Sequence, residues 1–285
     1  MEKIELLCNA KINLTLDITS KREDGYHNLD SVMQSVSIAD VVKVKKSDGI
    51  SVECSVSAFS GEKNIAFSAA QRFFEFADIN GGAEIYIEKH IPDAAGMGGG
   101  SADAAGVLIA LDKLYETNLS AEQLCFIAKT VGADVPFCLF GGTKRVQGIG
   151  EIILDCTSLK NCAFLIVKKG KKLSTADMYR KLDQFSQTTP NTENFVKVLK
   201  NGNLKQIAEN LSNDFEKDCD VSKEKELLLQ NGAIGVCLSG SGPSVYGIFE
   251  NAELAQKAKE KIKDQCIFAE IATPKTQSII IIKQK

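Results

Sequence analysis

Apolar and polar residues alternate along several short stretches of the chain, and this period of two predicts β-strands. In residues 9–16, Ile12, Leu14 and Leu16 alternate with polar residues, so one face of that strand is polar. A turn at Asp48 and Gly49 separates two such stretches and predicts a hairpin. The expected strands are 9–16, 41–46, 51–56, 83–88, 144–155 (with a bend at Gly148 and Gly150), 163–168, 233–238, 244–249, 267–272 and 279–282.

Apolar residues spaced three or four apart predict helices between these strands. After Ser101, apolar residues recur at 104, 107, 108, 111 and 114, which is one face of a helix. Ser120 and Gln123 have the spacing of a capping box, and Gly132 ends the helix that they begin. The other expected helices are 64–77, 176–184, 192–199, 204–211, 222–230 and 252–263.

The order of these elements predicts an α/β (α+β) chain with two domains. A chain of 285 residues is more often two packed domains than one, and 44% hydrophobic residues are ample for their cores. Composition changes within residues 156–162, so the expected domains are residues 1–158 and 159–285.

Charge and cysteine content narrow the class of protein. A net charge of −3 argues against a nucleic-acid partner, and no apolar run is long enough to span a membrane. No signal peptide is recognisable, so we expect a soluble cytoplasmic protein that binds small molecules. The nine cysteines lack a C-x-x-C pair and fit reduced, mostly buried thiols. With only His27 and His90, a structural zinc site is not expected, and no metal-binding residues are predicted.

The glycine-rich segment 92–105 carries the strongest chemical signal. Gly96 and Gly98 to Gly100 lie between the strand 83–88 and the helix after Ser101. Glycine allows an anion to approach the backbone, and the first N–H groups of a helix have no intrahelical partner. The segment therefore predicts a phosphate site, with a flexible glycine turn as the alternative. It matches neither the Walker A pattern, which needs a lysine after the glycines, nor the Rossmann pattern, which needs glycine where Ser101 stands.

Three other segments are candidates for chemistry. The polar face of residues 9–16 includes Lys11 and Asn13, but an ordinary half-exposed strand would look the same. In residues 132–137, Asp134 follows a helix end and is either a cap residue or a poised base. In residues 239–243, small residues around Ser241 would allow close packing against another loop, although a simple turn between strands is the alternative.

Together, these segments resemble the superfamily of galactokinase, homoserine kinase, mevalonate kinase and phosphomevalonate kinase. Its N-terminal motif, phosphate loop and C-terminal glycine loop occur here in the same order over nearly the whole chain. Met97 and Ala102 stand where the phosphate loop more often has Leu and Ser. The resemblance implies a ribosomal-protein-S5-like N-terminal domain, a ferredoxin-like C-terminal domain and a substrate cleft between them.

Four segments narrow the resemblance to the 4-diphosphocytidyl-2-C-methyl-D-erythritol kinase family. They are residues 10–14, 22–27, 98–103 and 132–137, of which the Asp-Gly-Tyr-His stretch ending at His27 is the most distinctive. The resemblance implies transfer of the ATP γ-phosphate to the C2 hydroxyl of the substrate, in non-mevalonate isoprenoid biosynthesis. ATP and Mg²⁺ are the implied cofactors.

The resemblance also implies a role for individual residues. Asp134 would be the base and Lys11 its catalytic partner, while Tyr26 would stack on the cytosine and His27 would hydrogen-bond to it. Other implied substrate residues are Asn13, Thr175 and Tyr179, and Asn64 would lie near the adenine. The implied ATP loop is Pro92, Ala94, Ala95, Gly96, Met97, Gly98, Gly99, Gly100, Ser101 and Ala102, and the third glycine loop is Gly240, Ser241 and Gly242.

Two alternatives remain at this point. One is a small-molecule kinase of the same superfamily with another alcohol acceptor, of the homoserine or mevalonate type. The other is a relative that binds nucleotide without catalysis, although the presence of both Lys11 and Asp134 argues against it. The sequence does not indicate an oligomeric state.

Overall fold

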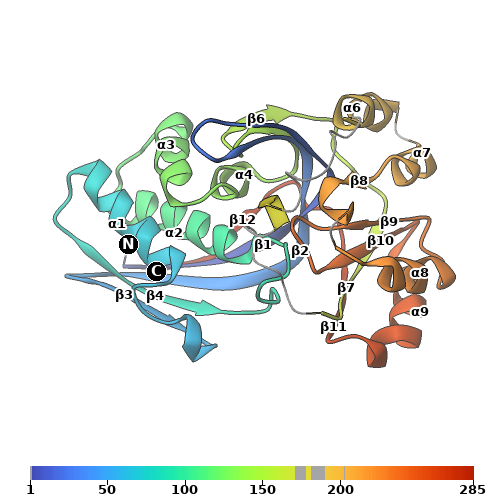
Figure 1. The fold of residues 1–285 in the computed structure, drawn as a ribbon. Helices are drawn as coiled ribbons and strands as arrows, with labels where there is room; N and C mark the ends of the chain where they lie inside the picture. Colours follow the sequence, from blue (N-terminus) through green and yellow to red (C-terminus); the bar gives the residue numbers. More distant parts are fainter. Residues whose placement is uncertain (1, 171–177, 181–189, 202, 218) are drawn as a thin grey trace.

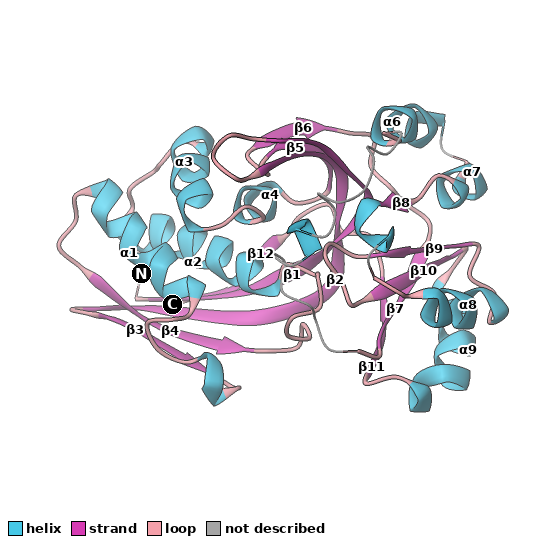
Figure 2. Ribbon diagram, in the orientation of Figure 1, coloured by secondary structure: helices cyan, strands magenta, loops and turns pink. Residues whose placement is uncertain are grey.

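Two β-sheets with helices packed on them form the protein (Figures 1 and 2). The computed structural model describes residues 2–170, 178–180, 190–201, 203–217 and 219–285. The first sheet has eight strands, and its main path runs β12-β1-β2-β4-β3, with β5, β6 and β8 attached at its side. Its strands are β1 (Lys3–Lys21), β2 (His27–Ser47), β3 (Ile50–Cys54), β4 (Gly82–Glu88), β5 (Thr143–Gly148), β6 (Ile152–Asp155), β8 (Ser212–Asn213) and β12 (Ile279–Gln284).

Four helices cover one face of the first sheet (Figure 1). Asn64 caps the first of them through Ala66 N, and Ser120 with Gln123 forms the expected capping box of the third. The second helix packs so tightly on β1 that a β-carbon at Gly106 would lie 2.3 Å from Cys8 Sγ. The four are α1 (Ile65–Ala77), α2 (Gly99–Tyr115), α3 (Ala121–Val131) and α4 (Val135–Phe140), with a short 3-10 helix η1 (Ser57–Phe59) before α1.

The second sheet has four antiparallel strands in the order β11-β7-β10-β9. Helices α8 and α9 cover its outer face, and the order β7-α8-β9-β10-α9-β11 is that of a ferredoxin-like fold. Its elements are β7 (Ala163–Lys168), α6 (Thr192–Asn201), α7 (Leu204–Glu209), η2 (Asp214–Lys217), α8 (Ser222–Gln230), β9 (Gly235–Leu238), β10 (Val245–Phe249), α9 (Ala252–Ile262), η3 (Lys263–Gln265) and β11 (Phe268–Ala272).

The two halves of the chain share a hydrophobic core. Ile12 and Leu14 of β1 pack with Phe164 of β7, Tyr246 of β10 and Phe195 of α6. The second sheet is therefore covered on both faces, by α8 and α9 outside and by the first sheet together with α6 and α7 inside. This arrangement buries both faces of β1, since Lys11 and Asn13 are also inaccessible to solvent. The expected half-exposed strand is thus wrong, because the segment around Gly98 and Asp134 covers the polar side of β1, while the second half of the chain covers the side with Ile12 and Leu14.

The expected hairpin between residues 41–46 and 51–56 is also wrong. Strand β4 lies between β2 and β3, pairing antiparallel with β2 and parallel with β3. The turn after β2 passes over the start of β4, where a β-carbon on Gly82 would lie 2.4 Å from the Gly49 carbonyl oxygen. Glycine at position 82 permits this crossing, whereas a β-carbon at Gly49 would meet open space. Local alternation predicts the strands, but it carries no information about a third strand inserted between them.

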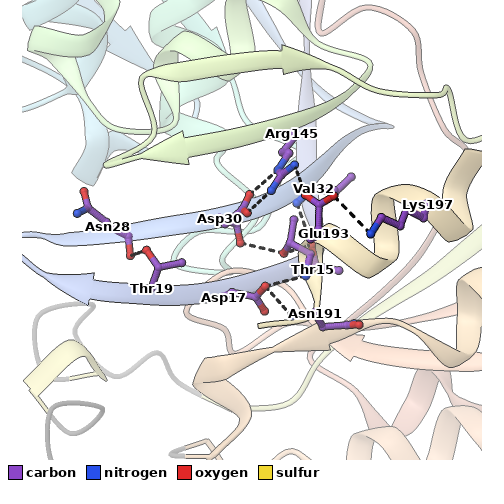
Figure 3. Close-up of polar contacts among 11 residues, drawn as sticks. Thr15, Asp17, Thr19, Asn28, Asp30, Val32, Arg145, Asn191, Glu193 and Lys197 are labelled. Atoms are coloured by element: carbon purple, nitrogen blue, oxygen red, sulfur yellow. Dashed lines mark hydrogen bonds and ion pairs between the residues drawn. The ribbon is translucent and has the colours of Figure 1, made fainter. Parts of the chain in front are cut away.

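Hydrogen bonds and ion pairs of charged side chains connect the β1–β2 pair to the C-terminal half (Figure 3). Asp17 Oδ2 accepts hydrogen bonds from the backbone N–H groups of Asn191 and Thr192, at the start of α6. Arg145 binds Asp30 through two nitrogen atoms and reaches Glu193 of α6 at 2.8 Å. Strand β12 also returns to pair with β1. The boundary near residues 156–162 stays a prediction.

Most other predicted elements agree with the structure within a few residues. This holds for the strands 83–88, 144–155, 163–168, 233–238, 244–249, 267–272 and 279–282, and for the helices 64–77, 192–199, 204–211, 222–230 and 252–263. Of the helix expected at 176–184, only residues 178–180 are described, and they are helical. All nine cysteines are free and are buried or partly buried, as expected. No helix among the described residues is long and apolar enough to cross a membrane.

Candidate active site

A cavity of about 830 Å³ lies between the two halves of the chain. We call it the main cavity. Seventeen of the predicted site residues line it: Lys11, Asn13, Tyr26, His27, Pro92, Ala94, Ala95, Gly96, Met97, Gly98, Gly99, Gly100, Ser101, Asp134, Tyr179, Gly240 and Ser241. Ala102 is buried in α2 instead, Gly242 packs against Leu238, and Thr175 lies outside the described residues.

The phosphate loop leads into the N-terminus of α2, which faces the main cavity. Gly98 adopts a φ of 67° and precedes α2, and no side chain caps the first N–H groups of the helix. These groups therefore remain able to bind an anion, which the helix dipole also favours. Ala94 and Gly96 also have positive φ angles, so the loop follows a tightly curved path. This geometry is that of the predicted phosphate site.

The third glycine loop, between β9 and β10, supports the phosphate loop from the other half of the chain. Ser239 Oγ donates a hydrogen bond of 3.0 Å to the Gly96 carbonyl oxygen. A β-carbon on Gly96 would lie 2.0 Å from the Ser239 carbonyl oxygen, and one on Gly240 would lie 2.9 Å from that of Gly96. Small residues are thus required on both sides, as the packing hypothesis for this loop predicts.

Lys11 and Asp134 form an ion pair at the edge of the phosphate loop. Their Nζ and Oδ2 atoms are 3.4 Å apart, and the side chains are 4% and 31% exposed, respectively. Asp134 begins α4 but makes no side-chain hydrogen bond to it. Of the two interpretations of Asp134, the geometry therefore disfavours a capping role, and the carboxylate stays accessible from the cavity.

Strand β1 holds Lys11 in place through irregularities in its pairing. The register between β1 and β2 shifts between Asn9 and Lys11 and again after Asn13, and such bulges re-aim side chains. The Lys11 backbone N–H donates to the Met97 carbonyl oxygen at 2.9 Å, which ties the strand to the phosphate loop. Lys11 Nζ also donates to Asn13 Oδ1 at 2.8 Å.

Asn13 is fixed from three directions. Its Nδ2 donates to Ser31 Oγ at 2.9 Å, and its Oδ1 accepts from Lys11. The hydroxyl of the buried Tyr246 donates to the Asn13 carbonyl oxygen at 2.8 Å. A polar network in a buried place favours one arrangement of its members when every member has a partner. The network therefore orients Lys11 rather than leaving it mobile in the cavity.

Aromatic rings gather at the other end of the main cavity. The His27 and Tyr179 rings are stacked, with centroids 4.8 Å apart, and Tyr179 meets the edge of Phe215 at 5.0 Å. Tyr26 is 62% exposed at the turn between β1 and β2. Arg22 and Asp24 form an ion pair across this turn, and Asp24 Oδ1 accepts from Tyr26 N. The structure thus brings Tyr26, His27 and Tyr179 to one place.

A second cavity of about 410 Å³ adjoins the phosphate loop. Asn64 lines this cavity rather than the main one, together with Gly100 of the loop. Lys89 and Asp93 line both cavities. Asn64 is therefore near the phosphate loop, as the prediction of a nucleotide contact requires.

Replacement of Gly98 by Val is expected to weaken ATP binding more than acceptor binding. A β-carbon there would lie 3.0 Å from Lys11 Cγ, and the φ of 67° is unfavourable for a branched residue. Calorimetry with Mg-ATP would measure the change. Gly232→Val is the control, because Gly232 has a φ of 95° but open space around it. Unchanged ATP affinity in folded Gly98→Val protein would count against the phosphate loop.

Some cavity residues were not predicted from the sequence. Phe215 lies about 190 residues downstream of Tyr26, and no motif marks it. Lys89 immediately precedes the phosphate loop, where a basic residue is a weak signal. The sequence signal for Asp103 is clearer. A carboxylate among the alanines at 102, 104 and 105 falls on the buried face of a helix, which is unusual for a charged residue.

Comparison with known proteins identifies the class of this fold and site. Residues 64–142 match the family model of the GHMP kinases N terminal domain, and residues 195–267 match that of the GHMP kinases C terminal domain. The protein is therefore an ATP-dependent kinase of the GHMP class, and the expected two-domain fold is confirmed.

Individual relatives define the family more narrowly. A 4-diphosphocytidyl-2-C-methyl-D-erythritol kinase of Thermoanaerobacter pseudethanolicus is 43% identical over 93% of each chain, and one of Clostridium novyi is 38% identical over 90% of this chain and 94% of its own. A crystal structure of 4-(cytidine 5'-diphospho)-2C-methyl-D-erythritol kinase has 32% identity and a TM-score of 0.79, covering 95% of this chain and 98% of its own. The chain belongs to the 4-diphosphocytidyl-2-C-methyl-D-erythritol kinase family.

Proposed function

We propose that this protein transfers the γ-phosphate of ATP to the C2 hydroxyl of 4-diphosphocytidyl-2-C-methyl-D-erythritol, a step of non-mevalonate isoprenoid biosynthesis. The observation that carries the proposal is the Lys11–Asp134 pair, which lies in one cavity with the phosphate loop and the aromatic cluster. Phosphoryl transfer depends mainly on positioning and on neutralisation of charge, and these groups can supply both.

In the proposed reaction Asp134 accepts the proton of the attacking hydroxyl. A tertiary alcohol is a poor nucleophile until a base removes its proton. Lys11 pairs with the carboxylate and stabilises negative charge that develops on the transferred group. Its Nζ lies 3.4 Å from Asp134 Oδ2, and its aliphatic chain runs beside Gly98 of the phosphate loop, which supports both roles.

The nucleotide occupies the other side of the site in this proposal. The N–H groups at the start of α2 bind the phosphate chain, and the nucleoside extends toward Asn64 in the second cavity. Magnesium accompanies the ATP phosphates, which suit its preference for oxygen ligands. No three His, Cys, Asp or Glu side chains within the described ranges are grouped so as to hold a metal ion.

In this proposal, Tyr26, His27 and Tyr179 bind the cytosine of the acceptor, far from the reacting hydroxyl. Tyr26→Ala and His27→Ala are expected to lower acceptor kcat/KM while the ATP KM stays almost unchanged. Stacking a base on an aromatic ring is worth ~1–3 kcal/mol, so loss of the Tyr26 ring should cost roughly 5–150-fold. The measurement is steady-state kinetics with the full acceptor and with one that lacks the cytidylyl group.

The truncated acceptor separates this proposal from its alternative. The wild-type protein should phosphorylate it poorly, and the two variants should lose little further activity with it. Equal turnover of both acceptors by the wild type would instead favour a kinase for another alcohol. The homoserine kinase of Cytophaga hutchinsonii shares the fold, with a TM-score of 0.78, but at 20% identity that likeness carries no argument about the acceptor.

A further inference from the structure

A buried polar cluster lies beside the phosphate loop and takes no part in the proposed transfer. It consists of Asp40 on β2, Lys89 just after β4 and Asp103 on α2. Lys89 Nζ donates to Asp40 Oδ2 and, at 2.8 Å, to Asp103 Oδ2. Asp40 Oδ1 accepts from the N–H groups of His90 and Ile91 at 2.6 and 2.8 Å. The cluster therefore fixes the chain where it leaves β4 and enters the phosphate loop.

The Asp103 carboxyl group is only partly satisfied. Asp103 is 2% exposed, and its Oδ1 has no hydrogen-bond partner within the described part of the chain. Asp103 also lines the second cavity, beside the phosphate loop. Burial first, and then the nearby Asp40, raise the pKa of Asp103 to about 8 against the lowering effect of Lys89. Its carboxyl group is therefore expected to be neutral at pH 7 and to ionise between pH 7 and 9.

Lys89 connects this cluster to the place where phosphates would bind. Its side chain lines both cavities. A β-carbon on Gly99 would lie 3.2 Å from Lys89 Nζ, so the ammonium group touches the first residue of α2. Asp103 is four residues further along the same helix. The cation and the carboxyl group thus both lie close to the positive end of the helix dipole.

We infer that Asp103 is a positioning residue of the nucleotide site, which holds Lys89 against the phosphate loop and permits tight ATP binding only while its own carboxyl group is uncharged. The inference rests on the proposed binding of ATP phosphates to that loop. With a neutral Asp103, the Lys89 charge and the start of α2 act together on a phosphate. An ionised Asp103 repels the phosphate and offsets the Lys89 charge that would attract it.

The other charged or titratable groups around Asp103 come from several elements. Cys8 of β1 and Cys138 of α4 are thiols whose pKa burial raises, so both stay neutral below pH 9. Burial lowers the pKa of Lys89, but the neighbouring Asp103 and Asp40 carboxyl groups raise it by more. The net pKa therefore lies above the ordinary value, and Lys89 stays charged. Lys63 and Asp93 line the second cavity nearby. A change in ATP binding between pH 7 and 9 that requires Asp103 therefore reports its carboxyl group.

Calorimetry with Mg-ATP alone tests the inference, because no acceptor is needed. The wild-type protein should bind Mg-ATP at least about fivefold more weakly at pH 9 than at pH 7, because an added negative charge beside the phosphates repels them. Asp103→Asn keeps the shape and an oxygen for Lys89 but cannot ionise. This variant should bind Mg-ATP as the wild type does at pH 7 and keep that affinity at pH 9.

Glu88→Gln is the matched control. It also removes a carboxylate next to Lys89 in sequence, but the Glu88 side chain is 42% exposed and pairs with Lys43 and His90. It should keep the pH dependence of the wild type. An equal loss of affinity in wild type and Asp103→Asn would overturn the inference, and so would a wild-type affinity that does not change with pH, even if Asp103→Asn failed to fold. Absence of Mg-ATP binding by the wild type at either pH would contradict the proposed function instead.

Discussion

Asp134→Asn is expected to lower kcat by ~10²–10⁴-fold, the usual range for loss of a general base, while both substrates still bind. The amide keeps the shape of the carboxyl group but cannot accept the proton of the acceptor hydroxyl. Asp134 makes no hydrogen bond that caps α4, so the substitution removes little structural support. The loss should therefore fall on the chemical step rather than on stability.

Steady-state kinetics and a thermal melt of the variant would measure both quantities. Asp155→Asn is the control, because Asp155 also pairs with a lysine, Lys144, but its side chain is 92% exposed and lies outside the main cavity. That variant should keep wild-type turnover. Near-normal kcat in correctly folded Asp134→Asn would contradict the assignment of the base.

Lys11→Met is expected to lower kcat by roughly 10²–10³-fold, comparable to the removal of one group that stabilises transition-state charge. Methionine replaces the aliphatic part of the side chain, which packs beside Gly98, but it carries no charge. Asp134 is partly exposed, so water can solvate it once the lysine is gone. The melting temperature should therefore change little.

The comparison that decides the role of Lys11 is between turnover and stability. Lys45→Met serves as the control, since Lys45 on β2 pairs with Glu84 at the surface. Turnover of that variant should equal that of the wild type. If Lys11→Met protein instead melts much earlier while its folded fraction turns over normally, Lys11 has a structural role only.

Local sequence patterns predict the elements of this fold better than their pairing. The phosphate loop and α2 are both recognisable, because glycines and helix-forming residues act on their nearest neighbours in the chain. The order β2-β4-β3 is not, because β3 and β4 pair with each other only across the long connection that contains α1. The burial of Lys11 is equally non-local, since the residues that cover it, Gly98, Asp134 and Gly240, are all distant from it in the sequence.

In the candidate site, too, the sequence indicates individual residues better than the contacts between them. Gly98 and Asp134 fall in short motifs, so the sequence alone indicates them. Nothing in the spacing of Lys11 and Asp134 indicates that they meet, and only the fold brings them within 3.4 Å. The Asp40–Lys89–Asp103 cluster joins three elements and has no continuous motif, which explains why sequence patterns do not predict it.

An acceptor screen with Mg-ATP tests the central claim most directly. The purified protein would be assayed for phosphate transfer to 4-diphosphocytidyl-2-C-methyl-D-erythritol, homoserine, mevalonate and galactose, each at the same concentration. The account predicts efficient transfer to the first compound alone, because only its cytosine can reach the Tyr26, His27 and Tyr179 cluster. Efficient phosphorylation of homoserine, mevalonate or galactose, with none of the cytidylyl compound, would contradict it.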